Sequence, residues 1–148
     1  MWLRILLHTI IFFTLSSFAG PIYGQTLELK VDFRMKDKEF VGGSYSLEVL
    51  GRNNNELIGR FDSRDGVISL PKADLDHEAY DVVIFSDKLR IFLDEVEIGL
   101  FQNKWLVEIW STSRVKRRDV SYVRASEYRV TFFPRNKEAV KTYYHLKK

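Results

Sequence analysis

Apolar and polar residues alternate along several short stretches of this chain, a pattern typical of β-strands with one buried face. Over residues 26–35 every second side chain is apolar, and charged side chains lie between them. The same period of two returns over residues 44–50 and 105–110. These stretches predict half-buried strands, whereas no stretch after residue 24 has the pattern of a convincing amphipathic helix.

Two further apolar runs, residues 57–61 and 67–71, lie on either side of the polar segment 62–66. Asp65 and Gly66 tolerate the positive φ angles that a tight reversal between twisted strands requires. We therefore expect a β-hairpin here, at the centre of the fold.

The remaining strands are weaker in pattern. They are predicted at residues 80–85, 89–100, 120–123, 128–133 and, as an edge strand or an ordered tail, 140–146. The alternation slips by one position at Asp94 and Glu95, which indicates a β-bulge or a second short strand. Residues 111–119 are expected to form a loop.

Short strands at intervals of about 8 to 12 residues are typical of an all-β domain. The spacing argues for a sandwich or a barrel. We predict a single antiparallel β-sandwich of about seven to nine short strands, transthyretin-like or Ig-like in architecture. The expected organisation is a signal peptide at residues 1–24, the sandwich at 25–136, and a basic C-terminal edge strand or tail at 137–148.

The N-terminal segment has the composition of a secretory signal peptide. Arg4 precedes an apolar run over residues 5–15, and small residues follow to Gly24. Cleavage after Ala19 or after Gly24 fits, and Gly24 is favoured because the strand pattern begins directly afterwards. An uncleaved anchor is the alternative, but the apolar run is shorter than the roughly 20 residues needed to span a bilayer. We expect an exported protein, periplasmic or at the cell surface, with no transmembrane segment in the mature chain.

Cysteine is absent from the sequence. An exported chain of this kind gains no disulfide, so its stability must come from its core. This composition fits a bacterial envelope or secreted protein better than a small extracellular animal domain.

Charge is distributed unevenly along the chain. Residues 25–100 contain 16 Asp and Glu against 10 Lys and Arg, whereas residues 101–148 contain 12 Lys and Arg against 4 Asp and Glu. Either the basic segment lies against the acidic part of the same domain, or it forms a cationic face for an anionic partner such as a glycan, a lipid head group or a protein.

Residues 40–100 resemble the carboxypeptidase-regulatory-like, transthyretin-like group of β-sandwich domains. The matching features are Gly42 and Gly43 before an apolar strand, the loop at 53–55, the turn at 62–66, and the strand that begins at Tyr80. The resemblance implies a seven-stranded sandwich and implies nothing about activity, because such modules share architecture rather than chemistry.

The sequence offers little support for a catalytic site. Beyond the signal peptide the histidines are His77 and His145, and only His77 has nearby carboxylates, Asp76 and Asp81, that could orient it. No Gly-x-Ser-x-Gly motif is present. We expect no enzyme activity and no cofactor, and a small secreted hydrolase is the third alternative.

We predict no metal site. The weak candidates are Asp74, Asp76, Glu78 and Asp81, which lack the spacing of a calcium loop.

Aromatic residues are concentrated late in the chain beside cations. They either fill the core or form a ligand face, since aromatic rings stack on sugars and bases. The candidates for such a face are Trp110, Arg129, Tyr143 and Tyr144. Export argues against nucleic acid as the ligand.

A basic run stands out just before the predicted strand at 120–123: Arg114, Lys116, Arg117 and Arg118. We interpret it as an exposed cationic loop; in a eukaryote it would resemble a dibasic processing site.

These observations together predict an exported, non-enzymatic binding module of the cell envelope, an accessory protein whose partner is another envelope or secreted protein. A carbohydrate-binding module that uses the late aromatics is the alternative.

Overall fold

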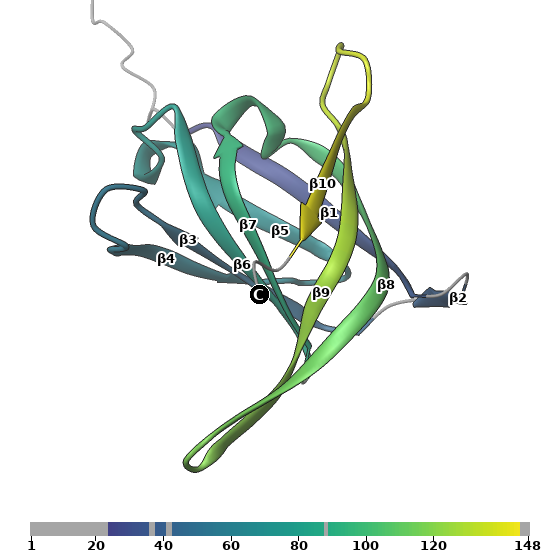
Figure 1. The fold of residues 1–148 in the computed structure, drawn as a ribbon. Helices are drawn as coiled ribbons and strands as arrows, with labels where there is room; N and C mark the ends of the chain where they lie inside the picture. The colour runs from purple at the N-terminus through teal and green to yellow at the C-terminus, as the bar shows by residue number, and fades with distance from the viewer. Residues whose placement is uncertain (1–23, 36–37, 41–42, 88, 146–148) are drawn as a thin grey trace, which may run out of the picture.

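The computed structural model describes residues 24–35, 38–40, 43–87 and 89–145, so residues 1–23 of the predicted signal peptide lie outside it. The described chain is all-β, as the alternation predicted (Figure 1). Its elements are β1 (Thr26–Met35), β2 (Lys38–Phe40), β3 (Tyr45–Leu50), β4 (Leu57–Asp62), β5 (Val67–Pro71), the 3-10 helix η1 (Lys72–Asp74), β6 (Ala79–Ser86), β7 (Leu89–Glu97), the 3-10 helix η2 (Ile98–Leu100), β8 (Asn103–Arg117), β9 (Val120–Phe133) and β10 (Val140–His145).

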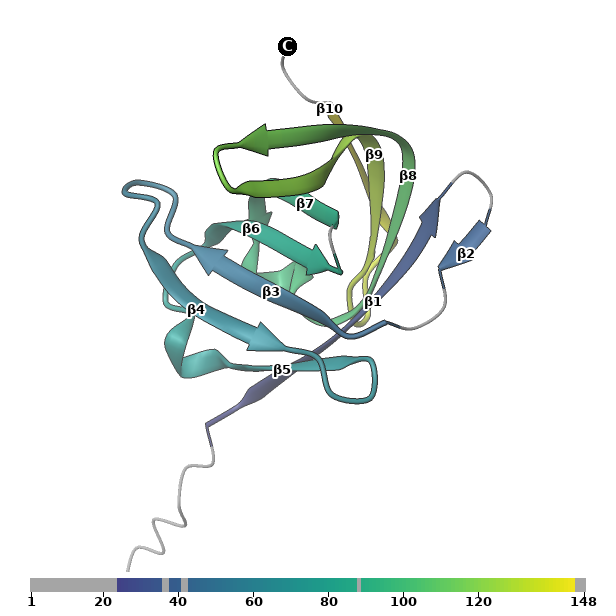
Figure 2. The ribbon, with the colours of Figure 1, turned by 90° about the horizontal axis from the view of Figure 1, so that it is seen from below.

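The strands belong to one mixed sheet that curls until it is nearly closed (Figure 2). Its hydrogen-bonded neighbours follow the order β5–β1–β8–β9–β7–β6–β3–β4, with β2 paired to β1 and β10 paired to β9. The pairs β1–β8 and β7–β9 are parallel, so the prediction of an antiparallel sheet is wrong. A sandwich of two sheets is not confirmed. Alternation reveals the two faces of a strand but not the direction of its neighbours.

The predicted turn at Asp65 and Gly66 is present, but the hairpin around it is not. Asp65 has φ 52° and Gly66 has φ 77°, and Arg64 and Val67 exchange backbone hydrogen bonds of 2.8 and 3.0 Å, as in a type I′ turn. Beyond this turn the strands separate, because β4 pairs with β3 and β5 pairs with β1. The segment predicted to be central therefore forms the two borders of the sheet.

Tyr45 bridges the gap that remains beside this turn. Its hydroxyl accepts a hydrogen bond from the Val31 backbone N–H of β1 (2.9 Å) and donates one to the Gly66 carbonyl (2.8 Å). The Tyr45 backbone N–H donates to Ser63 Oγ (2.9 Å). A buried side chain thus connects β1, β3 and the turn where no strand ladder does.

Two predicted details of the strands are confirmed. In β1 the apolar side chains Leu27, Leu29, Val31 and Phe33 are buried. In β7 the register passes from Val82↔Leu93 to Tyr80↔Val96, which places a bulge at residues 94–95. Glu95 adopts φ 57° there, and its backbone N–H donates to Asp81 Oδ1 (3.0 Å).

The inward side chains form one core inside the curled sheet. Tyr80, Phe101, Trp105 and Phe132 form an edge-to-face chain through it, with successive ring centroids 5.8, 5.5 and 5.2 Å apart. The helices η1 and η2 lie at the end opposite the long β8–β9 hairpin (Figure 1). The segment that connects η1 to β6 contacts η2 there, because the Ile98 N–H donates to the Glu78 carbonyl (2.8 Å).

The β8–β9 hairpin projects beyond the body of the molecule (Figure 1). We call its outer part, residues 111–124, the arm. The strands pair up to Arg117↔Val120, so the predicted loop at 111–119 and the predicted break after residue 123 are both wrong. The error has a physical cause: most of the arm faces solvent on both sides, so it carries no buried stripe that alternation could reveal.

Candidate functional site

The outer face of β1, β8, β9 and β10 carries a row of side chains that crosses four strands. Arg34 lies opposite Glu108, Glu108 opposite Arg129, and Arg129 opposite Tyr143. Residues opposite one another in a sheet have side chains on the same face and within contact distance. Strand pairing therefore brings together residues more than a hundred positions apart in the sequence.

Arg129 is held rigidly at the centre of this row. Its Nε donates to Glu108 Oε2 (2.7 Å), its Nη2 also contacts that carboxylate, and its Nη1 donates to the Tyr143 hydroxyl (3.1 Å). Arg34 Nη1 lies 3.8 Å from the other Glu108 oxygen. The hydrogen bonds with Tyr143 and Glu108 raise the pKa of Arg129, which secures its positive charge.

Two exposed aromatic rings lie beside Arg129. The centroids of Trp110 and Tyr143 are 6.3 Å apart, their planes differ by 11°, and the guanidinium carbon of Arg129 is 5.6 Å from each. Trp110 is 39% exposed and Tyr143 is 57% exposed. We call Trp110, Arg129 and Tyr143 the aromatic cluster. It presents two nearly parallel rings to solvent, in an orientation fixed by the arginine.

Tyr144, the fourth candidate from the sequence, does not join this cluster. It packs against the core and stacks on Tyr128, with centroids 5.3 Å apart and planes 9° apart. Burial raises its pKa to about 12. Adjacent residues in a strand point to opposite faces, so Tyr143 and Tyr144 cannot share a surface. The late aromatics thus divide between the core and the outer face.

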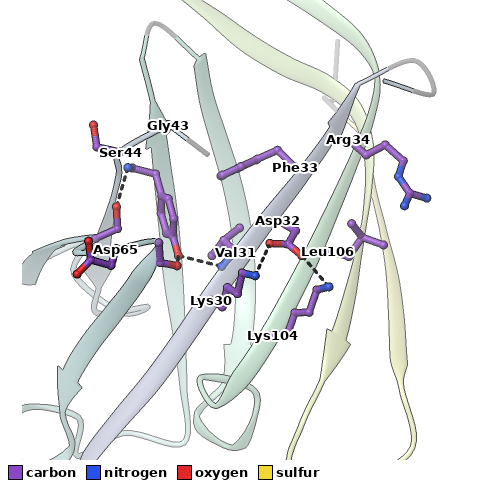
Figure 3. Close-up of a pocket in the computed structure, with 13 residues that line it drawn as sticks. Lys30, Val31, Asp32, Phe33, Arg34, Gly43, Ser44, Asp65, Lys104 and Leu106 are labelled. Atoms are coloured by element: carbon purple, nitrogen blue, oxygen red, sulfur yellow. Dashed lines mark hydrogen bonds and ion pairs between the residues drawn. The ribbon is translucent and has the colours of Figure 1, made fainter. Parts of the chain in front are cut away.

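A cavity of about 660 Å³ lies at the β1 border of the same face (Figure 3). It is lined by residues of β1 and β8, by the start of β3, and by the turn that precedes β5. Tyr45 forms part of its wall, so the cavity lies where the sheet does not close. Arg34 belongs both to the cavity lining and to the row that leads to the aromatic cluster, which makes the two features one continuous surface.

Charged side chains form part of the wall of this cavity, beside apolar ones such as Val31, Phe33 and Leu106. Asp32 lies between two lysines, with its oxygens 3.6 Å from Lys30 Nζ and 2.6 Å from Lys104 Nζ (Figure 3). One carboxylate between two ammonium groups leaves a net positive charge at this point. The cavity therefore suits a polar or anionic group better than an apolar one.

The basic segment pairs with the acidic part of the domain through β1–β8 and β7–β9, but few ion pairs connect the two parts. Within the part of the chain that the structure describes, only one Lys or Arg after residue 100 forms an ion pair with an Asp or Glu of residues 24–100. This residue is Lys104, which pairs with Asp32. Arg114, Lys116, Arg117 and Arg118 are exposed on the arm. Ion pairs therefore account for little of the charge distribution, and both interpretations of it stay predictions.

The acidic segment around His77 assembles no site. Asp76 Oδ1 lies 3.5 Å from His77 Nε2, and both side chains are mostly exposed. The structure does not gather Asp74, Asp76, Glu78 and Asp81, since no group of three or more potential metal ligands occurs within the described residues. Asp81 instead accepts the hydrogen bond from Glu95 at the β7 bulge.

One surface feature escaped the sequence analysis. On the outer face of the sheet, Arg60 of β4 and Arg90 of β7 both lie over the ring of Phe85. Arg90 also lies over Tyr122, and Arg124 of β9 lies over Phe92. A signal was present, because the run Val82–Phe85 places apolar side chains on both faces of β6. A continuous apolar run of this kind is typical of a strand covered on both faces, but it does not indicate that arginines provide the cover.

No protein-family model, curated protein or solved structure matches this chain. The resemblance to carboxypeptidase-regulatory-like domains consequently stays a prediction. Within the described residues, no helix has the length and apolar character needed to cross a membrane.

Proposed function

We propose that this protein is an exported, non-enzymatic binding module of the cell envelope, and that its binding face is the outer face of β1, β8, β9 and β10. The observation that carries the proposal is the aromatic cluster, in which Trp110 and Tyr143 are exposed and Arg129 is held beside both rings by its hydrogen bonds to Glu108 and Tyr143. Trp, Tyr and Arg are the residues most enriched at the energetic centres of protein interfaces.

The surroundings of the cluster favour a protein as the partner. Phe133, which is 39% exposed, lies on β9 on the same side of the sheet as Arg129. Lys104, Arg34 and Glu108 supply charges around these apolar groups. An apolar centre with a charged rim is the usual composition of a protein interface.

The near-parallel orientation of the two rings favours one alternative, a carbohydrate-binding module. Exposed aromatic rings in a fixed orientation offer flat surfaces on which sugar rings stack. The alternative uses the same residues, so a single variant tests both functions.

The test compares Trp110→Ala with the wild type as immobilised bait for proteins of the cell envelope and on an array of glycans. Leu57→Ala is the matched control, because Leu57 is 54% exposed and lies on β4, away from this face. Loss of a hot-spot side chain costs about 2 kcal/mol or more, so we expect binding to weaken at least about 30-fold.

Recovery of a defined protein by the wild type and by Leu57→Ala, but not by Trp110→Ala, supports the protein partner. The same pattern on glycans supports the carbohydrate-binding module instead. Binding that Trp110→Ala leaves unchanged in both assays contradicts the proposed face.

A further inference from the structure

Arg90 and Arg124 lie directly opposite each other on the parallel strands β7 and β9. Like charges in this position repel, which ordinarily disfavours the pairing. Their side chains are on the outer face, because the flanking residues Leu89, Ile91, Val123 and Ala125 point inward. This face lies on another part of the sheet from the aromatic cluster.

Aromatic rings hold both guanidinium groups. The Arg90 guanidinium carbon lies 4.1 Å from the Tyr122 ring centroid and 5.2 Å from that of Phe85. The corresponding carbon of Arg124 lies 4.6 Å from the Phe92 centroid. Cation–π contacts of this kind stabilise a cation through the flat face of the guanidinium and leave its N–H edge available.

Neither arginine has a carboxylate partner or a side-chain hydrogen bond among the described residues. Arg129 is the contrast, because its N–H groups donate to Glu108 and Tyr143. Within the described chain, no buried side-chain nitrogen or oxygen lacks a hydrogen-bond partner. The guanidinium nitrogens of Arg90 and Arg124 must therefore reach solvent.

We infer that Arg90 and Arg124 form a binding site for a phosphate or sulfate group. Neighbouring strands are about 4.8 Å apart, so the two arginines start close together. Tyr122 and Phe92 draw their guanidinium groups to opposite sides of the Arg90–Arg124 pair, so a tetrahedral oxyanion would lie between the two groups and accept hydrogen bonds from the edge of each that faces it. Ser113 of β8 lies opposite Arg124 and adds an exposed hydroxyl on the same face. The bound anion would offset the repulsion between the two arginines.

The arm strengthens the attraction for such a group. Arg114, Lys116, Arg117 and Arg118 of the arm are all exposed. Arg117 lies on the same face of the hairpin as Ser113 and Arg124, Arg118 lies in the turn, and Arg114 and Lys116 lie on the other face. Clustered positive charge raises the local concentration of anions and speeds their association. The site is thus suited to an oxyanion that is free or that belongs to a larger anionic molecule.

The test is a titration of the full mature chain with inorganic phosphate, followed by NMR signals of the arginine Nε–Hε groups at constant ionic strength. We expect saturable shifts of the Arg90 and Arg124 signals, and at least tenfold weaker binding in Arg90→Gln and in Arg124→Gln. Arg124→Lys keeps the charge but loses the planar fork, so it should also bind more weakly. Arg52→Gln is the matched control, since Arg52 is exposed and pairs with Glu95.

Two further probes identify the source of the oxyanion: vesicles of phosphatidic acid in phosphatidylcholine, and a sulfated oligosaccharide. Binding to any of the three probes that is lost in Arg90→Gln and Arg124→Gln supports the site. Shifts that do not saturate, or binding that these variants retain while their circular dichroism matches the wild type, overturn it. Full affinity in Arg124→Lys would also overturn it, because general charge attraction would then suffice.

Discussion

A single hydroxyl group holds together the part of the sheet that does not close. The Tyr45 hydroxyl pairs with the Val31 N–H and with the Gly66 carbonyl. Tyr45→Phe keeps the ring and its contact with Phe33 but leaves the Val31 N–H without a partner in a buried position. An unsatisfied buried donor costs about 1 to 3 kcal/mol, so we expect the free energy of unfolding in urea to fall by that amount.

Tyr143→Phe is the control for this measurement. It removes an exposed hydroxyl that bonds to Arg129, and surface changes of this kind usually alter stability by less than about 0.5 kcal/mol. Equal effects of the two substitutions would show that the Tyr45 hydroxyl does not stabilise the gap.

At the same scale, part of the candidate site was predictable from the sequence. If residues 140–146 form a strand, Tyr143 and Tyr144 must point to opposite faces. Alternation alone therefore places the two rings on different surfaces. The meeting of Trp110, Arg129 and Tyr143 was not predictable in this way. It depends on which strands are neighbours and in what register, and side-chain alternation contains neither fact.

Among the elements, the arm shows how a strand can form without a buried face. Arg114, Lys116 and Arg117 lie in a paired strand, whereas Arg118 lies in the turn with φ 45°. Proteases need a locally extended and unpaired substrate, so paired strands resist cleavage better than turns. Under brief digestion we expect trypsin to cut first after Arg117 or Arg118, as mass spectrometry would show, with the two fragments still associated.

Arg117→Gln combined with Arg118→Gln is the matched variant, and it should delay this first cleavage. If trypsin instead cuts first after Arg114, the outer part of the arm is not stably paired. The predicted loop would then describe its behaviour better than the strand does.

For the whole molecule, the sequence identified an all-β chain but not how it closes. The hydrophobic pattern located β1, β3, β4 and β5 closely, and chemistry at Asp65 and Gly66 located the turn. The inference that failed was that two strands joined by a tight turn must pair with each other. Here β5 pairs with β1, because burial of Leu27 and Leu29 against Ile68 and Leu70 gives both strands a common core face. Such contacts between distant segments cannot be read from local pattern.

The same closed core predicts how the molecule responds to alkaline pH. Burial raises the pKa of Tyr45, Tyr80 and Tyr128, and it raises that of Tyr144 to about 12. In the unfolded chain these groups ionise near pH 10, so above pH 10 the unfolded state loses protons that the folded state keeps, and for Tyr144 this window extends to about pH 12. The contribution of these tyrosines to stability should therefore be fully present below pH 10 and fall above it, by up to about 1.4 kcal/mol per pH unit for Tyr144.

Denaturant unfolding at pH 8, 10 and 11 measures this loss, and absorbance at 295 nm reports tyrosine ionisation in the same samples. Tyr144→Phe should make the decline in the free energy of unfolding above pH 10 shallower. Phenylalanine has no group that ionises, so one proton fewer is released when the chain unfolds. We expect Tyr45, Tyr80, Tyr128 and Tyr144 to ionise at higher pH than the exposed tyrosines while the protein stays folded. Ionisation of all tyrosines near pH 10 with the fold intact would mean that the sheet does not enclose these side chains as the structure indicates.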